Sequence, residues 1–252
     1  MDASEYHRIA ESEDAHWWYR STRALVQHLL ADVLRRDMVT LDVGAGPGGN
    51  GAWLGEYGTV VALDVEPIAL EYVRSQRPGL VPLQGSAVAL PIASATVDVV
   101  LALTVLYHID DDGAAFREIA RVLRPGGVAL VLEPAFSMLH REHDELTHGV
   151  RRYRKADLRR LALDAGLTVF RTTYAKSFLF APAAIIALVQ RLIGRRDSSK
   201  PPRSDLEPRP FDAVADAIFN RMANVENWLL RRRDLPFGTS VLIVARRAMS
   251  SR

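Results

Sequence analysis

The sequence predicts an α/β fold in which helices cover both faces of a mostly parallel β-sheet. Strand-like and helix-like segments alternate between residues 38 and 133, which is the order of consecutive βαβ units. The strand-like segments are nearly continuous apolar runs, such as residues 97–103 (VDVVLAL), and this pattern is typical of strands buried on both faces. A chain of 252 residues is long enough for one such domain with a sizeable core.

Each element of this core has a local signal. Residues 1–37 are expected to be helical because apolar side chains recur there at helical spacing. Pro67 suits the first turn of a helix. The expected order is strand 38–43, helix 49–57, strand 59–63, helix 67–76, strand 80–84, strand 97–103, helix 114–123, turn 124–127 and strand 128–133.

The pattern changes after residue 133. Residues 134–150 are rich in histidine and acidic residues without a clear period, and a Pro- and charge-rich segment at 194–210 predicts a mobile loop. Residues 178–193 form an apolar helix that is short for a membrane span, which needs about 20 residues. The remaining expected elements are helix 155–165, strand 167–174, helix 211–233 and strand 240–245.

Composition and charge exclude several classes of protein. Apolar residues make up 48% and charged residues 25%, which excludes wholesale disorder, and the lack of cysteine excludes disulfide scaffolds and thiolate metal sites. The first 20 residues show no secretory signal, so the cytoplasm is expected. Residues 1–150 hold 11 basic and 21 acidic residues, whereas residues 151–252 hold 21 and 9. The basic half suits an anionic substrate, a membrane surface or nucleic acid, or it attracts the acidic half.

The most informative segment is residues 41–51 (LDVGAGPGGNG), where the first strand meets a helix. Gly44, Gly46 and Gly49 satisfy G-x-G-x-x-G, and Asp64 follows 20 residues after Gly44, so a nicotinamide or flavin site is one interpretation. Asp42, however, stands just before the first glycine and would repel a pyrophosphate but attract a cationic ligand. No clear second mononucleotide-binding half follows residue 128.

Five motifs in order extend the pattern over about residues 38–134. They are LDVGAGPGG, VVALDVEP, QGSAVALPIASATVDVV, LTVLYHI and FREIARVLRPGGVALVLEP. With them the chain resembles the class I S-adenosylmethionine-dependent methyltransferases, in particular the type 11-like group that acts on small molecules. The resemblance implies a Rossmann-like, doubly wound, mostly parallel seven-stranded sheet. It also implies a helical lid at 1–37, a cofactor-binding core at 38–134 and a C-terminal part at 135–252 that carries an insert on the acceptor side.

The resemblance implies S-adenosylmethionine as the cofactor and assigns the residues that bind it. The chain departs from the family pattern at Ser86, where an aspartate is usual, so the contact with the adenine amino group is expected to be weaker. The expected contacts are Asp42, Gly44, Ala45 and Gly46 at the methionine end, Asp64 on the ribose hydroxyls, Val65 on the adenine, Ser86 and Ala87 at the adenine edge, and Leu103 after the fourth strand.

Methyl transfer from a sulfonium needs little more than positioning, and a base only where the acceptor must lose a proton. His108, directly after the fourth strand, and Tyr153 are the candidate catalytic residues. His140, His143 and His148 are weaker candidates. With Asp144 or Glu145 their spacing fits no standard zinc signature, so no metal is expected. Residues of the first helical segment that could fold over the site are His7, His16, Trp17, Trp18 and Tyr19.

The apolar helix at 178–193 allows two interpretations. It caps an apolar acceptor pocket, or residues 178–196 contact a membrane surface with Arg195 and Arg196 at the headgroups. Either favours a lipophilic or natural-product acceptor. Nucleic acid is not expected, because the basic run at 231–233 accompanies no recognised binding module. The alternatives are an NAD(P)- or flavin-dependent oxidoreductase and a non-catalytic S-adenosylmethionine-binding protein.

Overall fold

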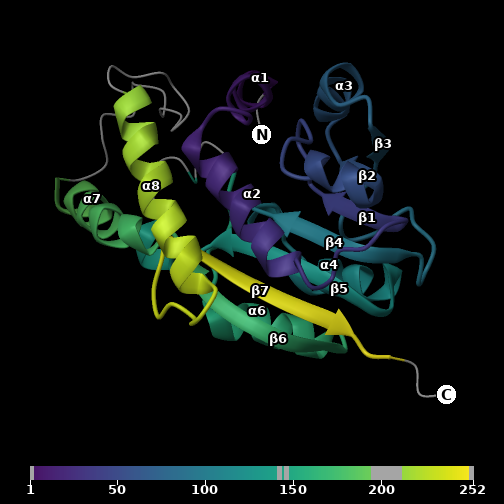
Figure 1. Cartoon of the computed structure of the whole chain (residues 1–252). Coiled ribbons are helices and arrows are strands. Elements are labelled where there is room, and N and C mark those ends of the chain that lie inside the picture. The colour runs from purple at the N-terminus through teal and green to yellow at the C-terminus, as the bar shows by residue number, and fades with distance from the viewer. Residues whose placement is uncertain (1–2, 141–143, 145–147, 194–211, 250–252) are drawn as a thin grey trace.

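The computed structural model of the chain describes residues 3–140, 144, 148–193 and 212–249. Its centre is a seven-stranded sheet with the order β3-β2-β1-β4-β5-β7-β6 (Figure 1). Strands β1 to β5 pair in parallel, and β7 runs antiparallel to both β5 and β6. This confirms the predicted mostly parallel seven-stranded sheet. The strands are β1 Met38–Val43, β2 Gly58–Asp64, β3 Leu80–Gln84, β4 Val97–Leu103, β5 Leu123–Pro134, β6 Leu167–Ala175 and β7 Ser240–Arg247.

Helices cover both faces of the sheet, as predicted (Figure 1). One face packs against α4 and α6, and the other packs against α2, α3 and the end of α8. Helix α8 lies on α2 rather than directly on the strands. The α-helices are α1 Ala3–Ser12, α2 Trp17–Leu30, α3 Pro67–Gln76, α4 Asp112–Val122, α6 Lys155–Asp164, α7 Phe180–Ile193 and α8 Asp212–Leu230.

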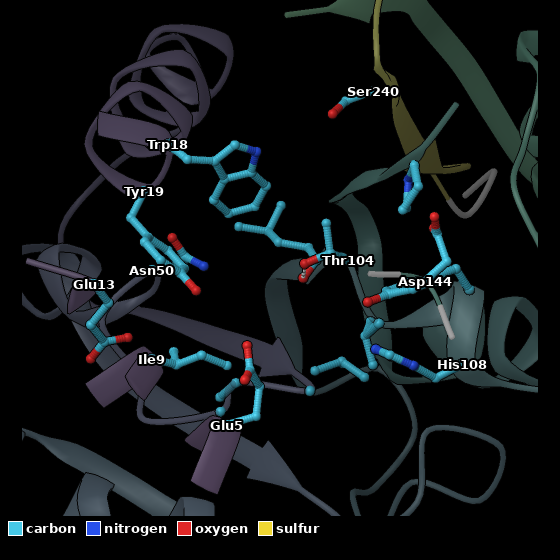
Figure 2. Close-up of a pocket in the computed structure, with 18 of the residues that line it drawn as sticks. Glu5, Ile9, Glu13, Trp18, Tyr19, Asn50, Thr104, His108, Asp144 and Ser240 are labelled. Atoms are coloured by element: carbon cyan, nitrogen blue, oxygen red, sulfur yellow. Dashed lines mark hydrogen bonds between the residues drawn. The ribbon is translucent and has the colours of Figure 1, made fainter. Parts of the chain in front are cut away.

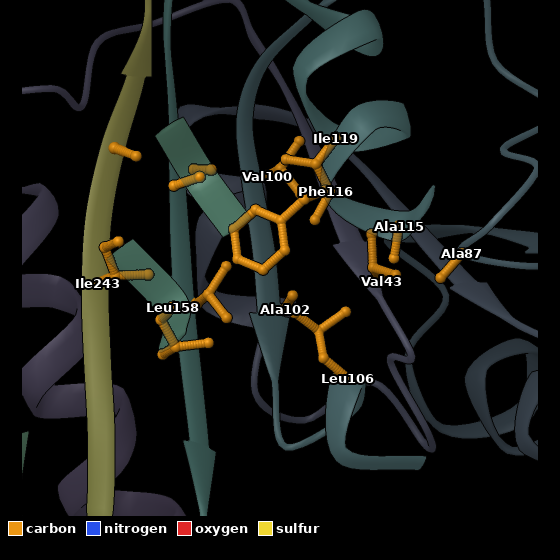
Figure 3. Packing of buried hydrophobic residues seen from close by; sticks show 14 of the residues in the cluster. Val43, Ala87, Val100, Ala102, Leu106, Ala115, Phe116, Ile119, Leu158 and Ile243 are labelled. Atoms are coloured by element: carbon orange, nitrogen blue, oxygen red, sulfur yellow. The ribbon is translucent and has the colours of Figure 1, made fainter. Parts of the chain in front are cut away.

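The core consists of two apolar layers, because successive residues of each strand point to opposite faces. Val100 and Ala102 of β4 belong to the layer under α4 and α6, whereas Val99 and Leu101 belong to the layer under α2. Phe116 of α4 is completely buried in the first layer, where it lies over the sheet close to Leu158 of α6 (Figure 3). The double burial explains why the central strands are apolar at every position.

Two predicted elements differ from the structure. The helix expected at 49–57 is a shorter 3₁₀-helix, Ala52–Tyr57. The turn expected at 124–127 lies inside β5. Pairing with β4 jumps from Val97–Leu123 to Val99–Val128, so these four residues bulge out of the ladder.

The C-terminal part follows the predicted order, with Ser177–Leu179 forming a 3₁₀-turn before α7. The loop predicted at 194–210 lies outside the described residues. Within the described part of the chain, no helix is both long and apolar enough to cross a membrane. The N-terminal helix α2 and the C-terminal helix α8 lie side by side over the sheet (Figure 1).

Candidate functional site

A cavity of about 810 Å³ lies at the carboxyl ends of the parallel strands and extends under the helices of both termini. Figure 2 shows Trp18 and Tyr19 of α2 on one side, His108 and Asp144 on the other, and Thr104 between them. Most of the predicted site residues line this cavity. They are Gly44, Ala45, Gly46, Asp64, Val65, Ser86, Ala87, Leu103 and His108. Asp42 and Tyr153 do not.

The glycine loop after β1 has the shape that its sequence requires. Gly44 and Gly46 have φ angles of +64° and +55°, in the left-handed region that favours glycine. A Cβ atom on Gly44 would overlap the side chain of Val105, whereas a Cβ atom on Gly46 would meet no atom within 4 Å. Since Gly46 lines the cavity, the space beside it is open to a ligand that approaches the backbone closely.

Asp64 ends β2 at the rim of the cavity. Its Oδ2 accepts a hydrogen bond of 2.9 Å from the Gly46 N–H, and its Oδ1 accepts one of 3.0 Å from the Glu66 N–H. Tyr6 of α1 lies near this carboxylate, whose charge adds to the burial that raises the pKa of the Tyr6 hydroxyl. Burial is the main cause that raises the pKa of Asp64 above its ordinary value. The carboxylate is fixed by the backbone and retains capacity to accept bonds from a diol.

Asp42 lies beneath the glycine loop and not on the cavity wall, in contrast to the prediction. Its side chain is buried against Gly51, and its Oδ2 has no hydrogen-bond partner among the described protein atoms. Burial, with smaller contributions from the charges of Glu13 and Asp64, raises the pKa of Asp42 from 3.8 to about 8. The carboxyl group is therefore largely protonated at neutral pH.

Glu13, which sequence reasoning did not single out, connects the N-terminal helices to the glycine loop. Its carboxylate accepts hydrogen bonds from the Gly49 N–H at 3.0 Å and from the Arg77 guanidinium at 2.9 Å. A Cβ atom on Gly49 would overlap this carboxylate. The third glycine of the motif thus makes room for a side chain of the N-terminal segment.

Glu133 shapes the turn that follows β4. The N–H groups of Val105, Leu106 and Tyr107 donate to its two carboxylate oxygens at 3.2, 2.9 and 3.2 Å. Glu133 is completely buried, and this burial raises its pKa to about 8. The turn includes Thr104 in the left-handed region, and it places His108 at the cavity rim. A lone glutamate in the apolar run VLEP is the sequence signal for this role.

Tyr153 is an anchor and not a wall of the cavity. Its buried hydroxyl donates to Asp112 Oδ2 at 3.0 Å and lies 3.2 Å from the Leu106 carbonyl oxygen. Burial is the main cause that raises its pKa above the ordinary value. This geometry gives no support to the predicted catalytic role of Tyr153. It ties the start of α4 to the turn that carries His108.

Charged groups near His108 come from the segment after β5. The Arg152 guanidinium pairs with Asp144 through two contacts of 2.9 Å, and both side chains are nearly buried and line the cavity with His148. His140 does not line the cavity, and His143 lies outside the described residues. No cluster of three or more His, Asp and Glu side chains in the described ranges could hold a metal ion.

The far end of the cavity is apolar and aromatic. Trp17 of α2 lies 5.1 Å from Phe219 of α8 and 5.9 Å from Phe178, measured between ring centroids. Of the lid residues suggested by the sequence, His7 does not line the cavity, and His16 caps α2 by accepting from the Trp18 N–H. The lining residues at this end are Trp17, Trp18, Leu179, Pro182, Ala183, Ile186 and Phe219.

The fold and the site together define a class. A seven-stranded sheet with an antiparallel β7, a glycine loop after β1 and an acidic residue at the end of β2 is the class I methyltransferase architecture. Residues 41–131 match the family described as "Methyltransferase domain". The chain therefore contains a methyltransferase domain, and its sheet has the class I methyltransferase fold.

Named relatives support this placement. A probable S-adenosylmethionine-dependent methyltransferase of Mycobacterium tuberculosis is 32% identical over 127 residues, or 50% of this chain and 46% of the relative. A malonyl-[acyl-carrier protein] O-methyltransferase of Enterobacter lignolyticus is 34% identical over 172 residues, or 66% and 65% of the two chains. The chain therefore spans about half the length of the mycobacterial relative.

A solved structure matches almost the whole chain. It is the complex between the Haloferax volcanii Trm112 methyltransferase activator and the putative methyltransferase. The similarity has a TM-score of 0.62 at 22% identity and covers 99% of this chain and 96% of that chain. This likeness concerns the fold.

Proposed function

We propose that the chain transfers a methyl group from S-adenosylmethionine to a small lipophilic acceptor. The observation that carries the proposal is that one cavity joins two different ends. The glycine loop and Asp64 line one end, and apolar residues of α2, α7 and α8 line the other. The turn with Thr104 and His108 lies between these ends, which is where the reacting atoms would meet.

The residues at the polar end fit the cofactor. The open space beside Gly46 admits a ligand against the backbone, and the Asp64 carboxylate accepts hydrogen bonds from ribose hydroxyls. Val65, with 61% of its surface exposed, offers an apolar face to the adenine, and Ser86 lies at its edge. When bound, S-adenosylmethionine supplies an electrophilic methyl group on a sulfonium, and the chain has to position the acceptor in line with it.

The acceptor end sets the expected substrate class. The aromatic side chains of Trp17, Trp18 and Phe219, with the aliphatic residues of α7, would exclude water from an apolar acceptor. His108 at the rim is the side chain placed to take a proton where the acceptor is a hydroxyl or a carbon acid. The paired Arg152 and Asp144 add a polar patch for the reacting group of an otherwise apolar molecule.

Two other functions remain alternatives, and they differ in ligand and in turnover. An oxidoreductase would bind NAD(P) or a flavin, but β6 and β7 form an antiparallel pair where a second mononucleotide-binding half would supply parallel strands. A non-catalytic S-adenosylmethionine-binding protein would bind the cofactor without consuming it.

Calorimetry with S-adenosylmethionine and NAD, followed by a turnover assay, tests the proposal. We expect S-adenosylmethionine to bind and NAD not to bind. We also expect the release of S-adenosylhomocysteine when acceptors from a panel of fatty-acyl, isoprenoid and aromatic compounds are added. Malonyl-[acyl-carrier protein] belongs in that panel because the Enterobacter lignolyticus relative is named for it. The variant Asp64→Ala should bind S-adenosylmethionine about 30-fold more weakly, which is the effect of one charged hydrogen-bonding group. The control Asp164→Ala, at an exposed position, should bind it like wild type. Binding of NAD in its place would overturn the proposal.

A further inference from the structure

Half of the eighteen large apolar side chains that are exposed on the described part of the chain lie on two helices, α7 and α8. Isolated exposed apolar residues are ordinary, but a gathering of this size marks an interaction surface. The members, here called the α7–α8 face, are Ile185, Ile186, Leu188 and Val189 of α7, and Val214, Ile218, Met222, Val225 and Trp228 of α8.

Helix α8 presents its apolar stripe outward. Val214, Ile218, Met222 and Val225 recur at the spacing of one helical face, and they are 58%, 51%, 40% and 58% exposed. In a helix that only covers a core, such a stripe faces inward. Among the residues of α8 whose exposure is described, Arg221 is the one charged residue that is exposed.

Helix α7 likewise buries small side chains and exposes large aliphatic ones. Its buried residues, Ala183 and Ala187, have the smallest side chains of the helix, whereas Ile185 is 63% and Leu188 is 56% exposed. Phe180 at the start of α7 packs on Phe136 and Phe237, but the large aliphatic side chains at 185, 186, 188 and 189 are directed to the outside. Packing within this chain therefore does not explain why α7 carries large apolar side chains on its exposed side.

The α7–α8 face is continuous with the acceptor end of the cavity. Ile186 lines the cavity and is also 45% exposed, and Phe219, next to Ile218, lines the same cavity from α8. Both helices stand at the same end of the molecule, away from β3 (Figure 1). An apolar molecule could pass from a surface covering this face into the cavity without crossing water.

Charge selects among the possible occupants. The two helices themselves hold two basic and three acidic residues, and the basic run at 231–233 directly after α8 is the part of this end that attracts an anionic surface. Arg231, Arg232 and Arg233 follow α8, and the Arg232 guanidinium lies 4.4 Å from the ring centroid of Trp228. The connecting residues 194–211 supply only two large apolar side chains, Leu206 and Phe211, against the nine of the face.

We propose that the α7–α8 face docks the protein on an anionic lipid surface. Apolar side chains would enter the headgroup region while arginines contact lipid phosphates, as in helices that lie in the membrane plane. The site is distinct from the cofactor pocket, so docking does not depend on the methyl-transfer reaction.

Vesicle flotation of the full chain tests the proposal. Wild-type protein should float with phosphatidylcholine vesicles that contain phosphatidylglycerol, and less with pure phosphatidylcholine or in high salt. The double variant Ile218→Glu, Val225→Glu should reduce the bound fraction about tenfold. Leu163→Glu, at a 48% exposed position of α6, is the matched control and should float like wild type. Ile185→Gln on α7 gives a second, milder variant if the double variant does not fold.

Three results would overturn the proposal. Wild-type protein could fail to float with anionic vesicles, or the face variants could float as well as wild type. Light scattering could instead show a dimer that the same variants dissociate, which would make a second copy the occupant. Calorimetry with S-adenosylmethionine on the same proteins reports the proposed function separately, since flotation requires neither donor nor acceptor.

Discussion

The buried carboxyl group of Asp42 should make the stability of the protein depend on pH. Its pKa is 3.8 when unperturbed and about 8 in the fold, chiefly because of burial. The folded protein therefore keeps a proton that the unfolded chain loses, and the stability falls as the pH rises between these two values. At about 1.4 kcal/mol per pH unit, the loss attributable to this group is about 4 kcal/mol at pH 7.

Replacing Asp42 with asparagine removes this loss. The amide is close in shape, but it brings a buried N–H₂ group whose unmade hydrogen bonds cost about 2 kcal/mol. The net expectation is a gain of about 2 kcal/mol at pH 7, which corresponds to a melting temperature higher by roughly 4–8 °C for a domain of this size. Below pH 4 the gain should turn into a small loss, because the carboxyl group is then protonated in both states.

Urea unfolding at a series of pH values measures this effect. The difference in free energy of unfolding between Asp42→Asn and wild type should increase steadily from pH 4 to pH 8 and then level off. The exposed Asp164→Asn provides the control and should follow the wild-type curve. Parallel curves for Asp42→Asn and wild type would refute the reasoning, since they would mean that Asp42 is ionised in the fold.

Three other substitutions test different parts of the structure. Glu133→Gln replaces one of the two carboxyl oxygens that accept from three N–H groups of the turn before His108 by a donor, and it should lower kcat about tenfold with S-adenosylmethionine affinity within about twofold of wild type; an equal loss in both would mean general unfolding. Tyr6→Phe removes a hydroxyl that lies near Asp64 in the cavity and competes with ribose for this carboxylate; it should strengthen cofactor binding about threefold in calorimetry, whereas weaker binding would show that the hydroxyl supports the site. Phe116→Ala empties the centre of one core layer and should cost about 3–5 kcal/mol in urea unfolding, and a cost below about 1 kcal/mol would contradict the packing seen there.

The cofactor half of the site could be predicted from the sequence because its signals are local. The positive φ angles of Gly44 and Gly46 favour glycine, which the sequence shows directly. The continuously apolar strands predict a sheet that is covered by helices on both faces. Asp64 follows at the end of the next strand, so its place at the rim depends only on the order of the elements. These features do not require knowledge of contacts between distant segments.

The rest of the site depends on contacts between residues far apart in the chain. Glu13 meets Gly49 across 36 residues, and Glu133 meets Leu106 across 27. The packing around the glycine loop decides whether the Asp42 carboxylate lies on the cavity wall or beneath the loop. The spacing of residues in the sequence does not determine this packing. For Tyr153, the sequence offers a hydroxyl near the expected site, but only the fold shows that it donates to Asp112.

The outward face of α8 was also beyond sequence reasoning. The sequence predicts a helix at 211–233 correctly, yet an apolar stripe on such a helix would serve for packing on a core or for display on the surface. The structure settles this direction because Leu230, Glu226 and Ala223 are buried instead.

A crystal structure with S-adenosylhomocysteine is the most direct test of the central claim, that the cavity between the glycine loop and Asp64 holds the methyl donor. We predict both ribose hydroxyls within hydrogen-bond distance of the Asp64 carboxylate, the adenine against Val65 and the sulfur facing the apolar end beside Thr104. Density for the ligand elsewhere on the protein, or a ribose turned away from Asp64, would contradict the account.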